Sequence, residues 1–328
     1  MIISKAPFRM SFVGGGSDFP SFYKNHGGAV LSSSIDKFIY ILVKSRFEKG
    51  IRCSYSKTEI VDNVNDLEHG LVRNALLDLK IQDSLEIVSS ADIPSSGSGL
   101  GSSSTFSVAL YNALLNYLGR EVSSQILAES ACKLEIELSG SPIGKQDQYA
   151  SAYGGMNVYE FHTNDTVSVH PVNLSNDFHK ELNDSILSFY IGGDRSSNDI
   201  LKEQDDNVKK NHNLTTLKKM VKLVWDLKNE MENKEISNFG EILNENWNLK
   251  KTLSNNISND AINQIYDEAI SCGATGGKLL GAGGGGFMIF ITRNEDVRSK
   301  LRNNFSKLRE VKLNLTDDRA GIIYKDIK

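Results

Sequence analysis

Residues 94–104, which read PSSGSGLGSSS, decide how this chain is expected to fold. They follow residues 85–93, which we expect to form a strand. They precede residues 105–117, where apolar side chains recur at helical spacing until Gly119 ends the helix. A strand, a glycine-serine loop and a helix in this order place backbone N–H groups at a helix N-terminus, where the dipole favours an anion. The segment therefore predicts a phosphate-binding loop, with a flexible linker as the alternative.

This loop departs from two common nucleotide-binding motifs. It lacks the GxxxxGK[ST] pattern, and Ser102 stands where GxGxxG needs its third glycine. Two other segments are also rich in glycine, VGGGSD at 13–18 and GATGGKLLGAGGGGF at 273–287. Glycine in ordered structure costs folding entropy, so such clusters indicate a close approach of the backbone to a ligand.

The length and the pattern of apolar residues predict two α+β domains. A chain of 328 residues exceeds what one compact core usually needs, and the expected ranges are 1–180 and 181–328. Alternating or short apolar runs predict strands, and helical spacing predicts helices. The expected strands cover 2–13, 29–47, 85–93, 185–193, 286–292 and the C-terminal AGIIYKDI, and the expected helices cover 105–117, 123–138 and several segments within 200–270. In the helix at 123–138, the buried face is expected to carry Ile126, Leu127, Leu134 and Leu138.

Composition excludes several classes of function. The formal net charge is −4 and no Lys/Arg stripe is present, which argues against a nucleic-acid partner. The three cysteines form no metal-binding or disulfide pattern, and the six histidines have no ligand spacing. The N-terminal MIISKAPFRMSF lacks the apolar run of a signal peptide, and no stretch of 18 apolar residues occurs. We therefore expect a cytoplasmic protein without a membrane partner. A monomer and a homodimer both remain open, because the sequence does not distinguish them.

Three motifs resemble those of the GHMP kinases, named for galactokinase, homoserine kinase, mevalonate kinase and phosphomevalonate kinase. PSSGSGLGSSS resembles the family's PxxxGLGSSxx loop, KAPFRMSFVGGGSDFP its N-terminal substrate motif, and GGKLLGAGGGGFMIF its C-terminal glycine-rich motif. They occur in the family's order and frame the chain from about residue 5 to about residue 290. The resemblance implies a two-domain architecture, with a ribosomal-S5-domain-2-like N-terminal domain and a ferredoxin-like C-terminal domain. It also implies an ATP-dependent phosphotransferase acting on an alcohol group with ATP and Mg²⁺.

The resemblance also implies roles for individual residues. The residues expected to bind the ATP phosphates are Pro94, Ser96, Gly97, Gly99, Leu100, Gly101, Ser102, Ser103 and Ser104. Ser103 would hold Mg²⁺ together with a helical glutamate. Glu135 matches that glutamate best, although one extra residue before the following aspartate leaves Glu137 as the alternative. Asp147 would face the substrate hydroxyl and accept its proton. Arg9 would keep Asp147 ionised, or it could form an ordinary salt bridge on a strand face.

The substrate motif points to a sugar phosphate. Where galactokinases have an acidic residue and a histidine before the sugar-binding aspartate, this chain has Gly15, Gly16 and Ser17 before Asp18. Together with QDQYASAYGG at 146–155, the pattern most resembles bacterial D-glycero-D-manno-heptose 7-phosphate kinases, and fucokinases share it. The resemblance implies transfer to the anomeric O1, giving a 1,7-bisphosphate for nucleotide-activated heptose and surface polysaccharide. The residues expected to bind substrate are Arg9, Gly15, Gly16, Ser17, Asp18, Asp147, Tyr153, Arg195, Lys278, Gly283 and Gly284, with Arg195 and Lys278 as candidates for the 7-phosphate.

Four alternatives remain open at this point. The chain could be a fucokinase-like sugar kinase, or a regulator that binds sugar and ATP without turnover. A decarboxylase acting on a diphosphorylated branched hydroxy acid would share the fold, but the GGGSD segment suits a polyhydroxylated ligand better. In the fourth alternative the glycine-rich segments are only connectors, and nucleotide would then have no effect on the stability of the protein. The polar region 195–215 is a candidate lid.

Overall fold

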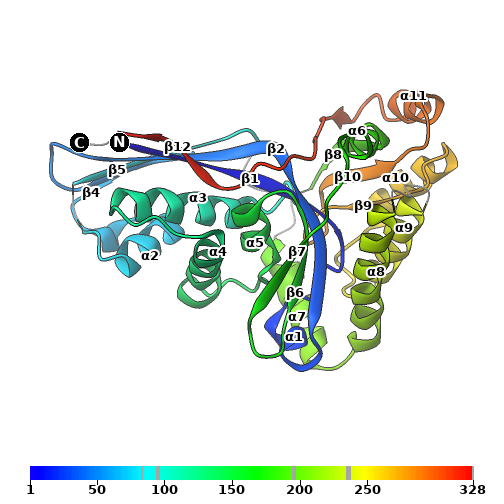
Figure 1. Cartoon of the computed structure of the whole chain (residues 1–328), viewed down its shortest axis with the longest axis horizontal. Helices are drawn as coiled ribbons and strands as arrows, with labels where there is room; N and C mark the ends of the chain where they lie inside the picture. Colours follow the sequence, from blue (N-terminus) through cyan, green and yellow to red (C-terminus); the bar gives the residue numbers. More distant parts are fainter. Residues whose placement is uncertain (83, 94–96, 194–196, 234–237, 327–328) are drawn as a thin grey trace.

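A computed structural model describes residues 1–82, 84–93, 97–193, 197–233 and 238–326. Figure 1 shows a wide sheet covered by helices on one face, joined to a smaller sheet with its own helices. Helices and strands occur in both halves of the chain, so the expected α+β class is confirmed.

The larger sheet is built on two long antiparallel strands, β1 (Ile2–Val13) and β2 (Gly28–Ser45). The sheet has eight strands in the order β12-β1-β2-β5-β3-β4, with β6 pairing to β2 and β7 to β6. One part of β2 pairs with β6 and another with β5, and Figure 1 shows this long strand bending between them. The remaining strands are β3 (Ile51–Ser54), β4 (Thr58–Val61), β5 (Leu85–Ala91), β6 (Met156–Phe161), β7 (Val167–Pro171) and β12 (Gly321–Lys325).

Helices cover one face of this sheet. α3 (Ser102–Tyr117) packs against β1 and β2. It also contacts the two helices that follow it on this face, α4 (Ser124–Cys132) and α5 (Gln146–Tyr153), so nearly all of its side chains are buried. The remaining helix on this face is α2 (Gly70–Asp78), while the short α1 (Pro20–His26) follows β1 and the 3-10 turn η1 (Val64–Asp66) follows β4. The layered arrangement buries one continuous apolar core between sheet and helices.

The expected helix over 123–138 changes its winding part of the way along. α4 ends at Cys132 and continues as a π-helical segment, η2 (Lys133–Leu138). Leu127 and Leu134 are buried as expected, but Ile126 is 50% exposed and Leu138 is 41% exposed, so the predicted buried face was wrong at those two positions. The wider turn of a π-helix rotates the residues that follow it relative to an α-helix. Glu135 is fully buried in this segment.

The smaller sheet has four antiparallel strands in the order β11-β8-β10-β9. Its strands are β8 (Ile186–Gly192), β9 (Gly276–Leu279), β10 (Gly286–Ile291) and β11 (Arg309–Glu310). The helices of this half are α6 (Asn176–Ser185), α7 (Ser197–Lys209), α8 (Leu214–Glu232), α9 (Phe239–Lys251), α10 (Asp260–Ser271) and α11 (Glu295–Asn304). α8 forms as an amphipathic helix because Leu217, Met220, Val224, Leu227 and Met231 recur on one buried face.

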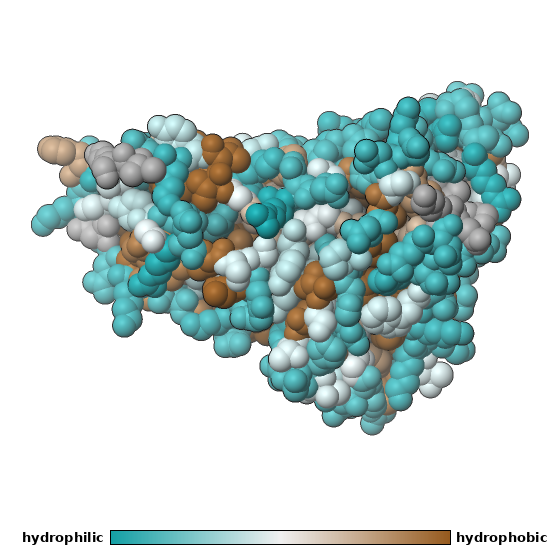
Figure 2. All heavy atoms as spheres, viewed as in Figure 1, coloured by the Kyte–Doolittle hydropathy of each residue, from teal (hydrophilic) through white to brown (hydrophobic). Residues whose placement is uncertain are grey.

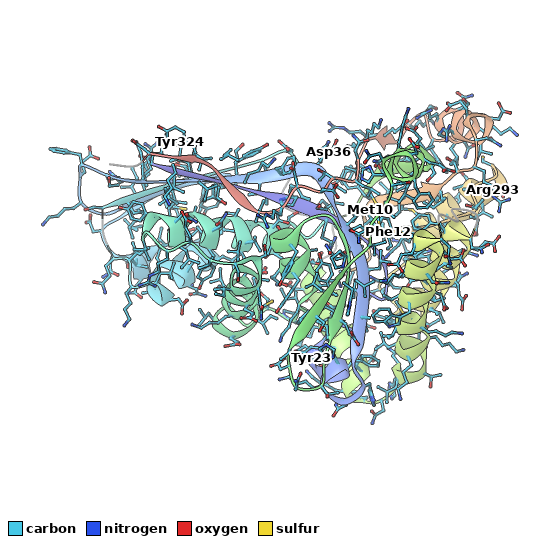
Figure 3. The ribbon with its side chains drawn as sticks, in the orientation of Figure 1. Met10, Phe12, Tyr23, Asp36, Arg293 and Tyr324 are labelled. Atoms are coloured by element: carbon cyan, nitrogen blue, oxygen red, sulfur yellow. The ribbon has the colours of Figure 1, made fainter. Side chains whose placement is uncertain are left out.

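The two halves meet at the end of β1, where Figure 3 labels Met10 and Phe12. The Phe12 ring packs edge-to-face against Phe239 of α9, with 5.4 Å between ring centroids. Asn246, also on α9, accepts a hydrogen bond from the Gly14 N–H at 3.2 Å. The glycine-rich turn after β1 is therefore held against the C-terminal half of the chain.

The chain does not divide cleanly near residue 180. β12, close to the C-terminus, returns to the larger sheet and pairs antiparallel with β1, so the two ends of the chain lie side by side (Figure 1). The helix α6 (Asn176–Ser185) spans the proposed boundary. The ranges 1–180 and 181–328 remain a prediction, with the qualification that residues 321–325 belong structurally to the first sheet.

The face of the molecule in Figure 2 is mainly hydrophilic, and its hydrophobic atoms lie in separate spots. Among the described residues, no helix combines the length and the apolar character needed to cross a membrane.

Candidate active site

The three glycine-rich segments converge in space. The backbones of the second and third touch directly: a Cβ added at Gly99 would lie 2.4 Å from the Leu280 carbonyl oxygen. The Phe287 N–H also donates to the Ser98 carbonyl at 3.2 Å. The first segment joins them through Lys250, whose ammonium donates to the Gly281 carbonyl at 2.7 Å and lies 3.7 Å from a Cβ built at Gly15. Glycine is therefore required where these loops cross.

Substituting Gly99 tests this close contact. We expect Gly99→Ala to lower the free energy of unfolding by more than the left-handed backbone alone costs, which is about 1–2 kcal/mol. Gly99 has a φ of +75°, and its new methyl group would also clash with the neighbouring loop. Gly119→Ala is the matched control, because Gly119 has a φ of +74° but nothing within 4 Å of its Cβ position. Urea unfolding of both variants measures the difference, and equal losses would contradict a tight contact between the loops.

The second glycine segment leads into α3. Gly101, with a φ of +77°, precedes the first helical residue, and no acidic side chain occupies the first turn. The Ser98 and Ser102 hydroxyls are 2.9 Å apart and hold the loop in shape, while Ser103 is exposed. The N-terminus of this 16-residue helix therefore presents N–H groups with no carboxylate in its own first turn, beside the Ser103 hydroxyl, which donates to Glu135. Pro94 and Ser96, which were also predicted to bind ATP, lie outside the described residues.

Arg9 and Asp147 form a bidentate ion pair next to this loop. The Arg9 Nε and Nη2 atoms each donate to one Asp147 carboxylate oxygen at 2.7 Å, and Nη1 donates to the Gly99 carbonyl at 2.8 Å. Arg9 is 4% exposed, whereas the Asp147 side chain remains 22% exposed. The arginine therefore positions the carboxylate and balances its charge, and the carboxylate keeps a face open to a ligand.

Asp18 lies in the same cavity and is held by neutral donors. One carboxylate oxygen accepts from the Gly16 N–H at 2.9 Å and from Gln146 Nε2 at 3.0 Å, and the other accepts from the Gln146 N–H at 3.2 Å. The Ser11 hydroxyl donates to Gln146 Oε1 at 3.0 Å, which fixes the orientation of that amide. Burial raises the pKa of Asp18, and the nearby charge of Asp147 raises it further.

A single cavity brings most of these groups together. The polar and charged side chains that line it are Arg9, Ser11, Asp18, Gln146, Asp147, Gln204, Lys250 and Lys278. Four of them, Ser11, Gln146, Gln204 and Lys250, were not predicted. Gln146 directly precedes Asp147 in a quoted motif and could have been suspected, but Lys250 comes from the middle of a polar helical region and has no local signal.

Glu135 forms a second buried site beside the helix N-terminus. It is fully buried, accepts hydrogen bonds from the Ser103 hydroxyl and from Gln148 Nε2 (2.6 Å), and burial raises its pKa to about 7. Gln148 Oε1 is buried and makes no hydrogen bond. Glu137, the alternative to Glu135, is exposed. The Ser103 and Glu135 oxygens are hard ligands of the kind that Mg²⁺ prefers, so the donor set fits this ion.

A metal held here would need ligands from elsewhere as well. In the part of the chain that the structure describes, no group of three or more His, Cys, Asp and Glu side chains could hold a metal ion. Nucleotide phosphates and water, which Mg²⁺ usually retains, would complete the coordination.

Several predicted residues lie away from the open cavity or make hydrogen bonds and contacts within the protein. The Ser17 hydroxyl is buried, donates to the Ala29 carbonyl at 2.9 Å and accepts from its N–H at 3.1 Å. Gly283 and Gly284 contact the backbone of Ile257. Arg195, a predicted cation for the substrate phosphate, lies outside the described residues.

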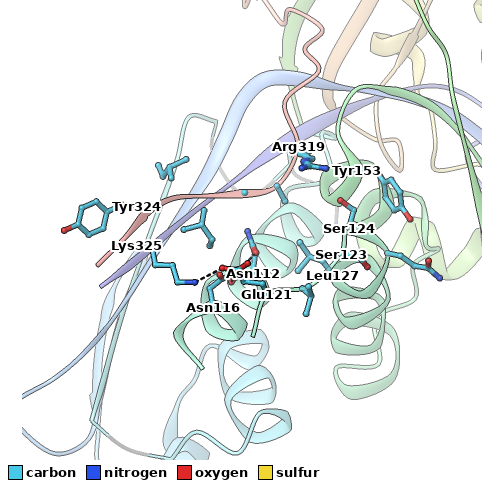
Figure 4. Close-up of a pocket in the computed structure, with 16 residues that line it drawn as sticks. Asn112, Asn116, Glu121, Ser123, Ser124, Leu127, Tyr153, Arg319, Tyr324 and Lys325 are labelled. Atoms are coloured by element: carbon cyan, nitrogen blue, oxygen red, sulfur yellow. Dashed lines mark hydrogen bonds and ion pairs between the residues drawn. The ribbon is translucent and has the colours of Figure 1, made fainter. Parts of the chain in front are cut away.

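Tyr153 lies in a different pocket. Figure 4 shows it at the end of α5, with Arg319, Ser123 and Ser124 around a hollow that β12 borders. Its ring stacks on Tyr149 with 6.0 Å between centroids. None of the residues that line this pocket also lines the cavity of Arg9 and Asp147.

Comparison with known proteins shows which family this chain resembles. Residues 69–155 match the family model described as GHMP kinases N terminal domain, and residues 223–309 match GHMP kinases C terminal. The chain is 29% identical to D-glycero-alpha-D-manno-heptose 7-phosphate kinase of Campylobacter jejuni, over 88% of this chain and 89% of that protein. It is 27% identical to the bifunctional fucokinase/GDP-fucose pyrophosphorylase of Arabidopsis thaliana, over 92% of this chain and 31% of that protein.

Solved structures share the fold along the whole chain. The crystal structure of a D-glycero-D-manno-heptose 1-phosphate kinase from Bacteroides thetaiotaomicron superposes with a TM-score of 0.80 and 25% identity, covering 100% of both chains. These similarities identify the chain as a phosphotransferase that uses an alcohol group as acceptor. The chain belongs to the GHMP kinase family.

Proposed function

We propose that this GHMP-family sugar kinase transfers the γ-phosphate of ATP to the anomeric O1 of D-glycero-D-manno-heptose 7-phosphate. The observation that carries the proposal is the open face of Asp147, which Arg9 fixes beside the N-terminus of α3 and in one cavity with Asp18. A phosphate donor site and an acceptor site thus meet at one carboxylate. The 1,7-bisphosphate product would serve nucleotide-activated heptose and surface polysaccharide synthesis, in the cytoplasm where ATP is available.

The cavity and the adjoining N-terminus of α3 have separate roles in this reaction. The N–H groups at the start of α3 and the loop at 97–101 hold the donor phosphates. Asp147 accepts the proton of the attacking hydroxyl, and Arg9 holds the carboxylate in place with two hydrogen bonds. Asp18 and Gln146 present polar atoms that can bind sugar hydroxyls. Ser103 and Glu135 would hold Mg²⁺, which neutralises charge on the β- and γ-phosphates when bound.

Similar proteins support a sugar phosphate as the acceptor. The relatives from Campylobacter jejuni and Bacteroides thetaiotaomicron are both named as heptose phosphate kinases, one for a 7-phosphate and one for a 1-phosphate. The Arabidopsis relative is named as a fucokinase, which keeps an unphosphorylated sugar as the second candidate acceptor. Basic side chains outnumber carboxylates in the lining of the cavity, with Arg9, Lys250 and Lys278 against Asp18 and Asp147. Burial lowers the pKa of both lysines, and a bound phosphate would restore their positive charge, which supports the phosphorylated acceptor.

A panel of acceptors tests the proposal. We expect Mg²⁺-dependent ADP production with heptose 7-phosphate to exceed that with free heptose, fucose, galactose and mevalonate by at least about 30-fold in kcat/KM. That ratio corresponds to about 2 kcal/mol for a desolvated charge contact with the substrate phosphate. Preference for fucose or free heptose would keep the kinase and overturn the substrate.

Mg-ATP binding can be measured on the same preparation by thermal unfolding. ATP at a hundredfold excess over its Kd should stabilise the protein by about 2.7 kcal/mol. Stabilisation without turnover on any sugar would favour a regulator that binds ATP, and no stabilisation would favour glycine segments that serve only as connectors.

A further inference from the structure

Lys250 is a buried basic side chain in the cavity to which the steps described above assign no individual role. It is the penultimate residue of α9, it is 6% exposed, and it lines the cavity together with Arg9, Asp18 and Asp147. A Cβ built at Gly15 would lie 3.7 Å from the Lys250 ammonium and 3.5 Å from Gln146 Nε2. The ammonium therefore faces the part of the cavity where the acceptor-binding residues are.

The hydrogen bonds of Lys250 leave donors available. Its ammonium donates to the Gly281 carbonyl at 2.7 Å, and the described residues offer it no carboxylate within 4.0 Å. Lys278 differs, because its ammonium donates to both the Ser11 and Phe12 carbonyls, at 2.7 and 2.8 Å, and is 1% exposed. An ammonium has three donors. Lys278 therefore links β9 to β1 through two hydrogen bonds. Lys250 makes one and so has more N–H donors available for a ligand.

The charge balance of the cavity favours an anion next to Lys250. Arg9 and Asp147 neutralise each other through their bidentate pair. Asp18 is held by neutral donors and burial raises its pKa, which weakens it as a counter-charge for the lysines. Burial lowers the pKa of Lys250 to about 8 and the positive charge of Arg9 lowers it further, while the charges of Asp18 and Asp147 offset only part of this. A buried cation that contacts no carboxylate lowers the stability of the folded protein, and an anionic ligand that binds here offsets that loss.

We propose that Lys250 binds a phosphoryl oxygen in this cavity and is a specificity-determining residue for the phosphorylated ligands of the enzyme. The inference rests on the proposed function and replaces Lys278 as the candidate cation for the substrate phosphate. Two sources share this chemistry: the phosphate that the acceptor already carries, and the phosphoryl group in transfer from ATP. The kinetics of one variant distinguish them.

The variant is Lys250→Met, which keeps the buried apolar stem and removes the charge. If Lys250 binds the phosphate of the acceptor, KM for heptose 7-phosphate rises at least about 30-fold while KM for free heptose rises much less. If it binds the phosphoryl group in transfer, kcat falls by a similar factor with both acceptors. Lys251→Met is the matched control: Lys251 is the next residue on the same helix, it does not line the cavity, and its ammonium lies 5.8 Å from the Trp247 ring centroid.

Two results would overturn the proposal. One is unchanged kcat and KM with both acceptors in Lys250→Met. The other is an equal rise in KM for phosphorylated and free heptose at constant kcat, which would indicate a contact with a sugar hydroxyl. Thermal unfolding without ligand shows whether the variant folds, and we expect its midpoint to equal or exceed that of the wild type, because a buried charge is removed.

A readout without turnover separates this inference from the proposed function. Inorganic phosphate at millimolar concentration should raise the unfolding midpoint of the wild type and of Lys251→Met more than that of Lys250→Met, which keeps only the phosphate site at the start of α3. If the wild type phosphorylates no sugar and phosphate still shows this difference, the proposed function fails and the phosphate site stands. Equal stabilisation of all three proteins by phosphate would reject the site.

Discussion

Asp147→Asn should lower kcat for the sugar substrate by about 10²–10⁴, the range that general-base assistance contributes. Asparagine keeps the shape of the side chain but cannot accept the hydroxyl proton. KM for ATP should change little, because the α3 N-terminus and its glycine loop remain intact. Steady-state ADP production at saturating Mg-ATP measures the effect.

The same carboxylate also holds Arg9, so the fold of this variant must be checked. Arg9 keeps its hydrogen bond to the Gly99 carbonyl and can still donate to the amide oxygen of the new side chain. Urea unfolding should therefore show a cooperative transition. Asp267→Asn, at an exposed position on α10, is the matched control and should keep wild-type kcat. A kcat within about threefold of wild type in Asp147→Asn would exclude Asp147 as the base, since the expected loss is far larger.

Glu135→Gln should change activity and stability in opposite directions. Burial raises the pKa of Glu135 to about 7, so between its ordinary value of 4.5 and that pH the folded protein binds more protons than the unfolded chain. Stability contributed by this group therefore falls as pH rises through that window and stays low above it. A neutral glutamine at this position removes that loss of stability. We expect the ligand-free variant to unfold at a higher temperature than wild type at pH 8, with the difference shrinking towards pH 4.5.

Activity should fall in the same variant, because a neutral amide is a poor ligand for Mg²⁺. Gln148 can turn its unpartnered Oε1 towards the new amide, so the pocket remains satisfied. Magnesium titration of kcat measures the loss, and Glu137→Gln, at an exposed position, should behave as wild type. The reverse pattern, with Mg²⁺ dependence lost only in Glu137→Gln, would move the metal ligand to Glu137.

The elements best predicted from sequence were those with a strong local pattern. β1 begins and ends at the predicted residues, and β8 and β10 lie within one residue of their predicted ends. α3 begins three residues earlier than predicted, because the serines of the glycine loop form its first turn. The π-helical turn was missed because its apolar residues also fit an α-helix. β12 was predicted as a strand, but no local pattern could show that it pairs with β1.

The site was predictable where residues sit in motifs and not where the fold brings in distant side chains. Arg9, Asp18 and Asp147 come from two segments about 130 residues apart and line one cavity. Lys250 comes from a polar helix and reaches the cavity only because α9 packs against β1 and β9. The glycine loops were recognisable from composition, but their direct backbone contact depends on how the two halves of the chain pack.

The position of the transferred phosphate tests the central claim most directly. Wild-type protein incubated with Mg-ATP and heptose 7-phosphate should give a sugar with a second phosphorus resonance coupled to the anomeric proton, measured by correlated ³¹P and ¹H NMR. Omitting the acceptor should leave ATP unconsumed. A phosphate on any other carbon, or ATP consumed without a phosphorylated sugar, would contradict transfer to the anomeric hydroxyl.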